Sequence, residues 1–318
     1  MIVAIIQNQG RNDMEGFKIS TALEEFLCEC DIKNSSLSTY SRVLKLYFKY
    51  LFIKRLEFNR VKREHIIQYK KYMAELHEPK TVNLYISVVK RFYSWAEMSG
   101  LYSNVAKGIK LMRVPHTYKR MPLTIDQVDK LISAIDRDKL TGKRDFVLVN
   151  LMVKTGLRRI EVHRLDIGDL IELNGRFALK IQRKGHDGKD QYKVLSTQLF
   201  DELTDLICAR PKVKNSDPMF ISYAPGRKGH RLNTDDISRI IKGYMNGIGL
   251  TDDLYSCHSL RHTTAVTLLD AGYDMHYVQM FMGHSSPATT QLYTKVISDR
   301  IAFDDKGINS LEKVFKSN

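Results

Sequence analysis

A segment with two prolines divides this chain into two parts of different character. Residues 111–122, Leu-Met-Arg-Val-Pro-His-Thr-Tyr-Lys-Arg-Met-Pro, show no hydrophobic periodicity. Because a proline disfavours helix in the residue before it, we expect an extended linker here. We therefore expect an N-terminal tail over 1–17, one domain over 18–110 and a second over 123–318. A length of 318 residues suits two ordinary domains.

The first part carries apolar residues at helical spacing and is expected to contain helices only. One stripe, expected to follow a cap at Asn34-Ser35-Ser36, consists of Leu37, Tyr40, Val43, Leu44, Tyr47 and Leu51. A second stripe consists of Leu84, Val88, Phe92 and Trp95. The basic residues Arg42, Lys45, Lys49, Lys90 and Arg91 lie beside these stripes. They are either solvated helix faces or contacts to phosphate groups.

The second part is expected to be mixed, with helices around one β-hairpin. Thr124 and Gln127 have the spacing of a capping box that opens a helix. Strands are expected at 177–181 and 191–195, joined by a long basic turn that contains Asp187-Gly188. Further helices are expected at about 197–209, 233–247, 258–272 and 274–282. The predicted fold class is mainly α, a helical domain followed by a mixed α/β domain with a small antiparallel hairpin sheet.

The charge is positive and evenly spread over both parts. The chain has 50 basic and 36 acidic residues, a formal charge of +14, and residues 1–110 carry half of that excess. This favours a polyanion contacted along the whole molecule, nucleic acid before membrane, against the alternative of a merely basic enzyme. No apolar run approaches the 18–20 residues of a membrane span, and the apolar opening over 1–6 is too short for a signal peptide.

Four cysteines, Cys28, Cys30, Cys208 and Cys257, form no disulfide framework and no zinc-binding pattern. We expect them to be reduced and structural, in a cytoplasmic protein.

Unusual polar residues follow the apolar run over 146–153. Gly156 is expected to end that helix, and Arg158 to lie in the first turn of the next, with Glu161 three residues on and able to hold it. Farther along, His258 and Arg261 share one helix face. An imidazole beside a guanidinium suits an anion that also needs proton transfer, and an arginine beside a histidine disfavours a metal. Each segment alone also fits an ordinary surface position.

Taken in order, these segments resemble the signature of the tyrosine recombinase (phage integrase) family. They are Thr155-Gly156-Leu157-Arg158 with Glu161, Lys184 before Gly185, His258-Ser259-Leu260-Arg261-His262, Gly283-His284-Ser285, and Tyr293 nine residues after His284. The resemblance covers about 122–297 and, more loosely, the helical part as a SAM-like core-binding domain. It implies a site-specific recombinase that cuts and rejoins double-stranded DNA without cofactor or metal.

The resemblance also implies a role for each of these residues. Tyr293 would attack the scissile phosphate and form a 3′-phosphotyrosyl bond, while Arg158 and Arg261 would hold the non-bridging oxygens. His258 would be the general base, and His284 would donate a hydrogen bond to the phosphate. Lys184 would protonate the leaving 5′-oxygen, and Glu161 would orient the group.

The sequence departs from the family pattern at the hairpin. Relatives often have glycine before the lysine, where this chain has Arg183, so Lys189 is a rival to Lys184 as the general acid. The segment Val194-Leu195-Ser196 lacks the usual proline. Alternatives are a type IB topoisomerase and a catalytically silent DNA-binding protein. About 17 residues precede the first helix, which favours the compact Xer/Cre-like form without an arm-binding domain.

The segment after Tyr293 suggests assembly. Ile308, Leu311, Val314 and Phe315 form a short apolar stripe, and so short a helix is stable only when docked. It packs either on its own domain or, as relatives do, on a neighbouring protomer in a homotetramer on DNA. Two basic domains and a linker also predict a clamp around the duplex. Accessory DNA-bending proteins, the host and the target sequence are not indicated.

Overall fold

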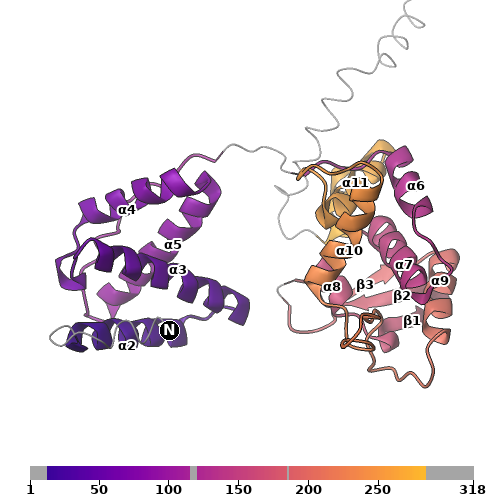
Figure 1. Cartoon of the computed structure of the whole chain (residues 1–318), viewed down its shortest axis with the longest axis horizontal. Helices are drawn as coiled ribbons and strands as arrows, with labels where there is room; N and C mark the ends of the chain where they lie inside the picture. Colours follow the sequence, from indigo (N-terminus) through magenta and orange to yellow (C-terminus); the bar gives the residue numbers. More distant parts are fainter. Residues whose placement is uncertain (1–12, 115–119, 185, 284–318) are drawn as a thin grey trace, which may run out of the picture. The chain divides into compact units, whose positions relative to one another are not determined.

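The computed structural model describes residues 13–114, 120–184 and 186–283 (Figure 1). The chain divides into two compact units, 1–115 and 116–318. His284, Tyr293 and the apolar stripe over 308–315 lie outside the described residues. Within the described ranges no helix is both long and apolar enough to cross a membrane.

The first unit is built from helices in its described part. They are α2 (Asp13–Glu29), α3 (Asn34–Ile53), the short 3-10 helix η1 (Phe58–Arg60), α4 (Arg63–Leu76) and α5 (Pro79–Met98). The two apolar stripes of the sequence meet in its core, where Tyr47 on α3 and Phe92 on α5 are at most 1% exposed. The hydroxyl groups of Tyr47 and Tyr93 are hydrogen-bonded at 2.9 Å inside this core.

Three details of this unit differ from the sequence-based expectation. Helix α2 begins at Asp13, inside the segment 1–17 that was expected to be a tail. Asn34 is already the first residue of α3, and the capping position belongs to Lys33, which makes no side-chain capping bond. Leu84, expected to be buried, is 40% exposed, because the buried face of α5 turns toward Tyr85 and Val88. A stripe drawn at every fourth residue drifts around a helix of 3.6 residues per turn.

The second unit surrounds a buried helix. Its helices are α6 (Ile125–Ser133), α7 (Leu140–Thr155), α8 (Arg159–His163), η2 (Ile167–Asp169), α9 (Thr197–Cys208), α10 (Thr234–Gly247), α11 (Cys257–Asp270) and α12 (Met275–Met282). Helix α7 packs between α9 and α11 (Figure 1), and its Leu148 and Leu151 have no exposed surface. The expected capping box is present, since Thr124 and Gln127 exchange bonds at the start of α6.

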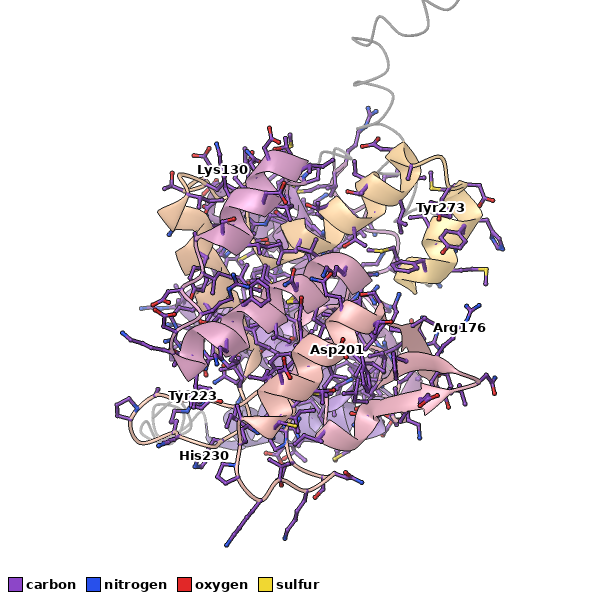
Figure 2. All side chains as sticks on the ribbon, turned by 90° about the vertical axis from the view of Figure 1, so that its right-hand side faces the viewer. Lys130, Arg176, Asp201, Tyr223, His230 and Tyr273 are labelled. Carbon is purple, nitrogen blue, oxygen red and sulfur yellow. The ribbon has the colours of Figure 1, made fainter. Side chains whose placement is uncertain are left out.

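A small antiparallel sheet covers one side of this unit. Its strands are β1 (Leu170–Leu173), β2 (Arg176–Ile181) and β3 (Gln191–Val194), in that order across the sheet. The hairpin of β2 and β3 agrees with the sequence-based prediction, whereas β1 was not predicted. Leu179 of β2 faces Leu170 on one side and Lys193 on the other. In Figure 2, Arg176 on the sheet and Tyr273 between α11 and α12 point away from the body of the unit.

Candidate active site

The turn between α7 and α8 places an arginine and a glutamate together. Gly156 ends α7 in the left-handed conformation, at φ 65°, which a residue without Cβ adopts at little cost. Arg158 then caps α8, one residue before the helix that was expected to contain it. The buried Glu161 carboxylate accepts bonds from the backbone N–H and the Nη1 of Arg158, each at 2.8 Å. The guanidinium is therefore held in one orientation, since an ion pair and a backbone bond fix both partners.

A second arginine joins this turn to the end of α12. Arg261 on α11 is 2% exposed. Its Nη1 donates to the carbonyl of Gly156, 105 residues away in sequence, and its Nη2 donates to the carbonyl of Met282. A Cβ at position 156 would lie 2.8 Å from both Cε and Sδ of Met282. The three elements are thus packed in direct contact around one guanidinium.

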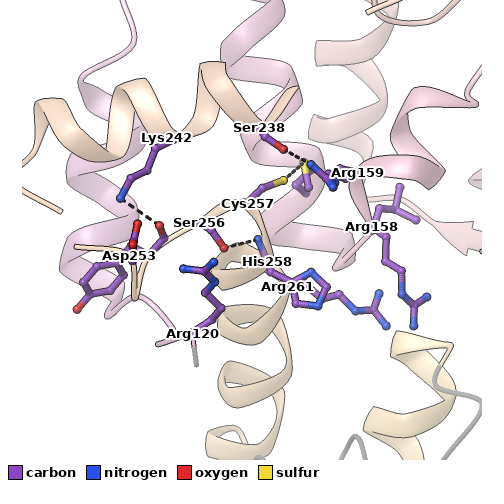
Figure 3. Close-up of a pocket in the computed structure, with 13 residues that line it drawn as sticks. Arg120, Arg158, Arg159, Ser238, Lys242, Asp253, Ser256, Cys257, His258 and Arg261 are labelled. Atoms are coloured by element: carbon purple, nitrogen blue, oxygen red, sulfur yellow. Dashed lines mark hydrogen bonds between the residues drawn. The ribbon is translucent and has the colours of Figure 1, made fainter. Parts of the chain in front are cut away.

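The two arginines lie at a cavity of about 440 Å³ whose lining is rich in cations. Figure 3 shows the side chains of Arg158 and Arg261 directed to the same side of it. The neighbouring Arg159 also lines the cavity, but its side chain donates to Ser238 at 2.8 Å and lies 3.6 Å from Asp235, both on α10. Lys242 donates to backbone carbonyls of residues 250–252 and 255 and so holds the loop before α11. Five basic residues and one carboxylate line the cavity, which therefore favours an anion.

His258 belongs to the first turn of α11, which Ser256 caps by accepting a bond from the His258 backbone N–H. The residue retains exposed surface, yet the protein packed around the ring and, after it, the charges of Arg261 and Arg158 lower the pKa of His258 to about 4. The ring is therefore neutral at pH 7 and can accept a proton. Among the described residues, no group of three or more His, Cys, Asp or Glu side chains is placed to hold a metal ion.

The hairpin lysines differ in their surroundings. Lys189 is bound to Asp166 at 2.7 Å and to Asp169, which fastens the hairpin to η2. Burial of Asp166 opposes its ionisation, but bonds from Lys189 and Arg231 outweigh it and lower the pKa of that carboxyl. Lys184 is exposed at the turn, and its charge is among those that lower the pKa of His258.

Lys193 on β3 was not singled out from the sequence. It is 5% exposed, and its Nζ lies 4.1 Å from the centre of the Phe281 ring on α12. Burial and, after it, the charge of Arg261 lower the pKa of Lys193 to about 7, with Arg158 adding to the effect and Glu161 opposing it. The clue to its burial is the strand register. Lys193 is paired with Leu179 on β2, and residues opposite each other in an antiparallel pair point to the same face of the sheet.

The basic residues expected on the first unit have varied partners. Arg42, Lys45 and Lys49 are exposed on α3. Lys90 donates to the Ile109 carbonyl at 3.1 Å. Arg91 lies over the Tyr40 ring, 5.7 Å from its centre.

Comparison with known proteins finds two family models along the chain. The phage integrase family model matches residues 122–300, and the model of the phage integrase N-terminal SAM-like domain matches 22–100. Tyrosine recombinase XerD of Ralstonia nicotianae is 30% identical over 86% of this chain and 87% of its own. Tyrosine recombinase XerA of Pyrococcus furiosus is 27% identical over 93% of this chain and 96% of its own.

The fold also matches a solved structure. XerH site-specific recombinase bound to palindromic difH substrate, in a post-cleavage complex, aligns with a TM-score of 0.69. The alignment has 19% identity and covers 98% of this chain and 91% of that one.

Proposed function

The chain belongs to the phage integrase family of tyrosine recombinases and is a site-specific recombinase that cuts and rejoins DNA, and we propose that Tyr293 is its nucleophile. The Tyr293 oxygen would attack the scissile phosphate, release the 5′-oxygen and form a 3′-phosphotyrosyl bond. A covalent link of this kind keeps the energy of the phosphodiester for rejoining, so the reaction needs no external energy source.

Arg158 and Arg261 would hold the non-bridging oxygens of that phosphate. Both are permanently charged, and both are already held in place, Arg158 by Glu161 and Arg261 by the carbonyls of Gly156 and Met282. Donors that need no reorganisation stabilise the extra charge of the transition state most effectively. That two motifs 105 residues apart meet at one backbone carbonyl is the observation that carries the proposal.

His258 would take the proton of the Tyr293 hydroxyl as it attacks, and His284 would donate a hydrogen bond to the phosphate. The lowered pKa of His258 supports the first role, because the base must be neutral before the reaction.

Lys184 would give a proton to the leaving 5′-oxygen. Its rival Lys189 has two carboxylates as partners, whereas Lys184 is exposed on the turn that the hairpin presents. A lysine that must approach DNA cannot also hold two carboxylates in the protein, which favours Lys184.

Both parts of the chain would bind the same DNA duplex. Residues 18–110 would act as a core-binding domain, with Arg42, Lys45 and Lys49 on phosphates and Lys90 and Arg91 beside them, and residues 111–122 as the linker. Residues 123–318 would form the catalytic domain, and its apolar stripe over 308–315 would dock on a neighbour, giving a homotetramer on double-stranded DNA. We propose that the reaction takes place in the cytoplasm, where the four free cysteines would stay reduced.

Neighbouring arginines provide the test of this site. The protein first selects its binding duplex from a random pool. That duplex is then nicked beside the cleaved phosphate, so that the released fragment diffuses away and the covalent adduct accumulates. We expect Arg158→Lys to slow adduct formation by about 10²–10³-fold, the cost of losing one oriented donor.

Arg159→Lys is the matched control, since the Arg159 side chain lines the same cavity but is bonded to Ser238 on α10, whereas Arg158 is held by Glu161. It should change the rate of adduct formation by less than about threefold, within the usual variation of a surface substitution. An equal loss in the two variants, or an unchanged rate in Arg158→Lys, would remove Arg158 from the phosphate site.

A further inference from the structure

An arginine from the linker lines the cavity of the candidate active site. Arg120 shares this lining with Arg158 and Arg261, although it precedes α6 and was not singled out from the sequence. The residue is half-buried. In the view of Figure 3, His258 lies between the side chain of Arg120 and that of Arg158. The cavity thus has an arginine on each side of the histidine.

Backbone bonds fix the place of Arg120. The next residue, Met121, donates its N–H to the carbonyl of Leu254 at 2.9 Å. Two residues farther on, the N–H of Leu123 donates to the hydroxyl of Thr263 on α11 at 2.8 Å. The end of the linker is therefore attached both to the loop before α11 and to α11 itself, the helix that carries the histidine and one arginine of the site.

Arg120 differs from the other cations of this lining in having no protein partner. Arg158 is paired with Glu161 at 2.8 Å, Arg159 donates to a serine of α10, and Lys242 donates to backbone carbonyls. Within the described ranges, no hydrogen bond or ion pair engages the side chain of Arg120. A guanidinium has five N–H donors and stays charged, so this one is available to an anion.

A DNA strand brings more than one anion to this place. A round cavity of about 440 Å³ spans about 9 Å, more than the roughly 3.4 Å of helix axis by which successive phosphates of one strand advance. When one phosphate lies beside Arg158 and Arg261, its neighbour on the same strand is therefore within reach of the same lining. Arg120 supplies the cation on the other side of His258.

We propose that Arg120 binds the phosphate next to the cleaved one on the same strand. A guanidinium can hold a phosphate through two parallel hydrogen bonds. Phosphate contacts set the register of a protein on its duplex, so this contact would position the cleaved phosphate between Arg158 and Arg261. It would also attach the end of the linker to the DNA. This inference rests on the proposed function, because the cleaved phosphate must lie beside those two arginines.

Methylphosphonates, which lack the negative charge of a phosphate, test this contact. They are placed one at a time along the selected duplex, and binding to Tyr293→Phe is measured by fluorescence anisotropy, so that no covalent step enters. A methylphosphonate next to the cleaved position should weaken binding about tenfold or more, the effect of losing a charged hydrogen bond. With Arg120→Gln added, the same methylphosphonate should weaken binding by less than about threefold, because its partner is already absent.

The salt dependence of binding gives a second readout. On the unmodified duplex, Arg120→Gln should lower the slope of log Kd against log salt concentration by about 0.9, the value for one phosphate contact. Arg113→Gln is the matched control, an exposed arginine of the same linker that belongs to the first unit. It should leave the effect of the methylphosphonate next to the cleaved position at about tenfold or more.

Arg158→Lys locates the cleaved phosphate without cleavage. It should reduce the effect of a methylphosphonate at one position, and Arg120→Gln should reduce it at the position beside that one. An effect that Arg120→Gln leaves unchanged at every position, or reduces only at a position that is not the neighbour, would overturn the proposal. Neighbouring positions for the two arginines, together with no adduct on Tyr293, would remove the nucleophile and support this contact.

Discussion

Replacing Gly156 with alanine should damage both the stability of the second unit and its site. The residue has φ 65°, and an added Cβ would lie 2.8 Å from Cε and Sδ of Met282. The left-handed conformation costs an alanine about 1–2 kcal/mol, and an additional methyl group in a packed site costs about 1–3 kcal/mol. The free energy of unfolding should therefore fall by about 2–5 kcal/mol.

Gly175→Ala separates the two contributions. Gly175, in the turn between β1 and β2, has φ 71° but nothing within 4 Å of the position of a Cβ. It should show the conformational cost alone, so the two variants should differ by about 1–3 kcal/mol. In a unit of this size each kcal/mol lowers the Tm by about 2–4 °C. Thermal unfolding followed by circular dichroism measures the Tm of the two variants.

The packing contribution should depend on Met282. In a Met282→Ala background, Gly156→Ala should cost less than in the wild type by about the packing contribution of 1–3 kcal/mol. Because Arg261 is bonded to the carbonyls of both residues, Gly156→Ala should also slow adduct formation well below the Tm. Equal Tm losses in Gly156→Ala and Gly175→Ala, with a normal adduct rate, would refute this reasoning.

Three further perturbations test the site and the DNA grip. Glu161→Gln removes the buried charge that holds Arg158. It should lower the free energy of unfolding by about 1–3 kcal/mol and slow adduct formation about tenfold or more. An unchanged stability together with an unchanged adduct rate would contradict the role of Glu161. Lys184→Ala should slow cleavage, and a 5′-phosphorothiolate substrate should rescue it because a sulfur leaving group needs no proton. Rescue of Lys189→Ala instead would transfer the acid to Lys189. Deleting residues 1–110 should reduce the salt dependence of DNA binding, and an unchanged salt slope would show that the helical domain makes no phosphate contacts.

Much of the fold could be predicted because local signals agreed with tertiary packing. The capping box at Thr124 and the glycine at 156 each mark a helix boundary through their own chemistry. Strand β1 gave no such signal, since four residues, Leu-Ile-Glu-Leu, have no periodicity to measure. It forms because β2 offers an edge for pairing, which is a property of the folded sheet.

The site could be predicted only where residues form a motif. Arg158 and Glu161 are neighbours on one turn, so their spacing already suggested contact. Lys193 lies in an alternating strand where a lysine is ordinarily solvated, and only the register against the fully buried Leu179 turns it inward. The contact between Arg261 and the Gly156 carbonyl joins distant segments and follows from packing of α11 on α7.

Mapping the covalent bond between protein and DNA tests directly whether Tyr293 is the nucleophile. The adduct with the nicked duplex is digested with protease and nuclease, and mass spectrometry locates the nucleotide on its peptide. We expect a nucleotide 3′-phosphate on Tyr293 and no adduct in Tyr293→Phe, which should still bind the duplex with near wild-type affinity. A nucleotide attached to any other residue, or an adduct rate in Tyr293→Phe within about tenfold of the wild type, would contradict it.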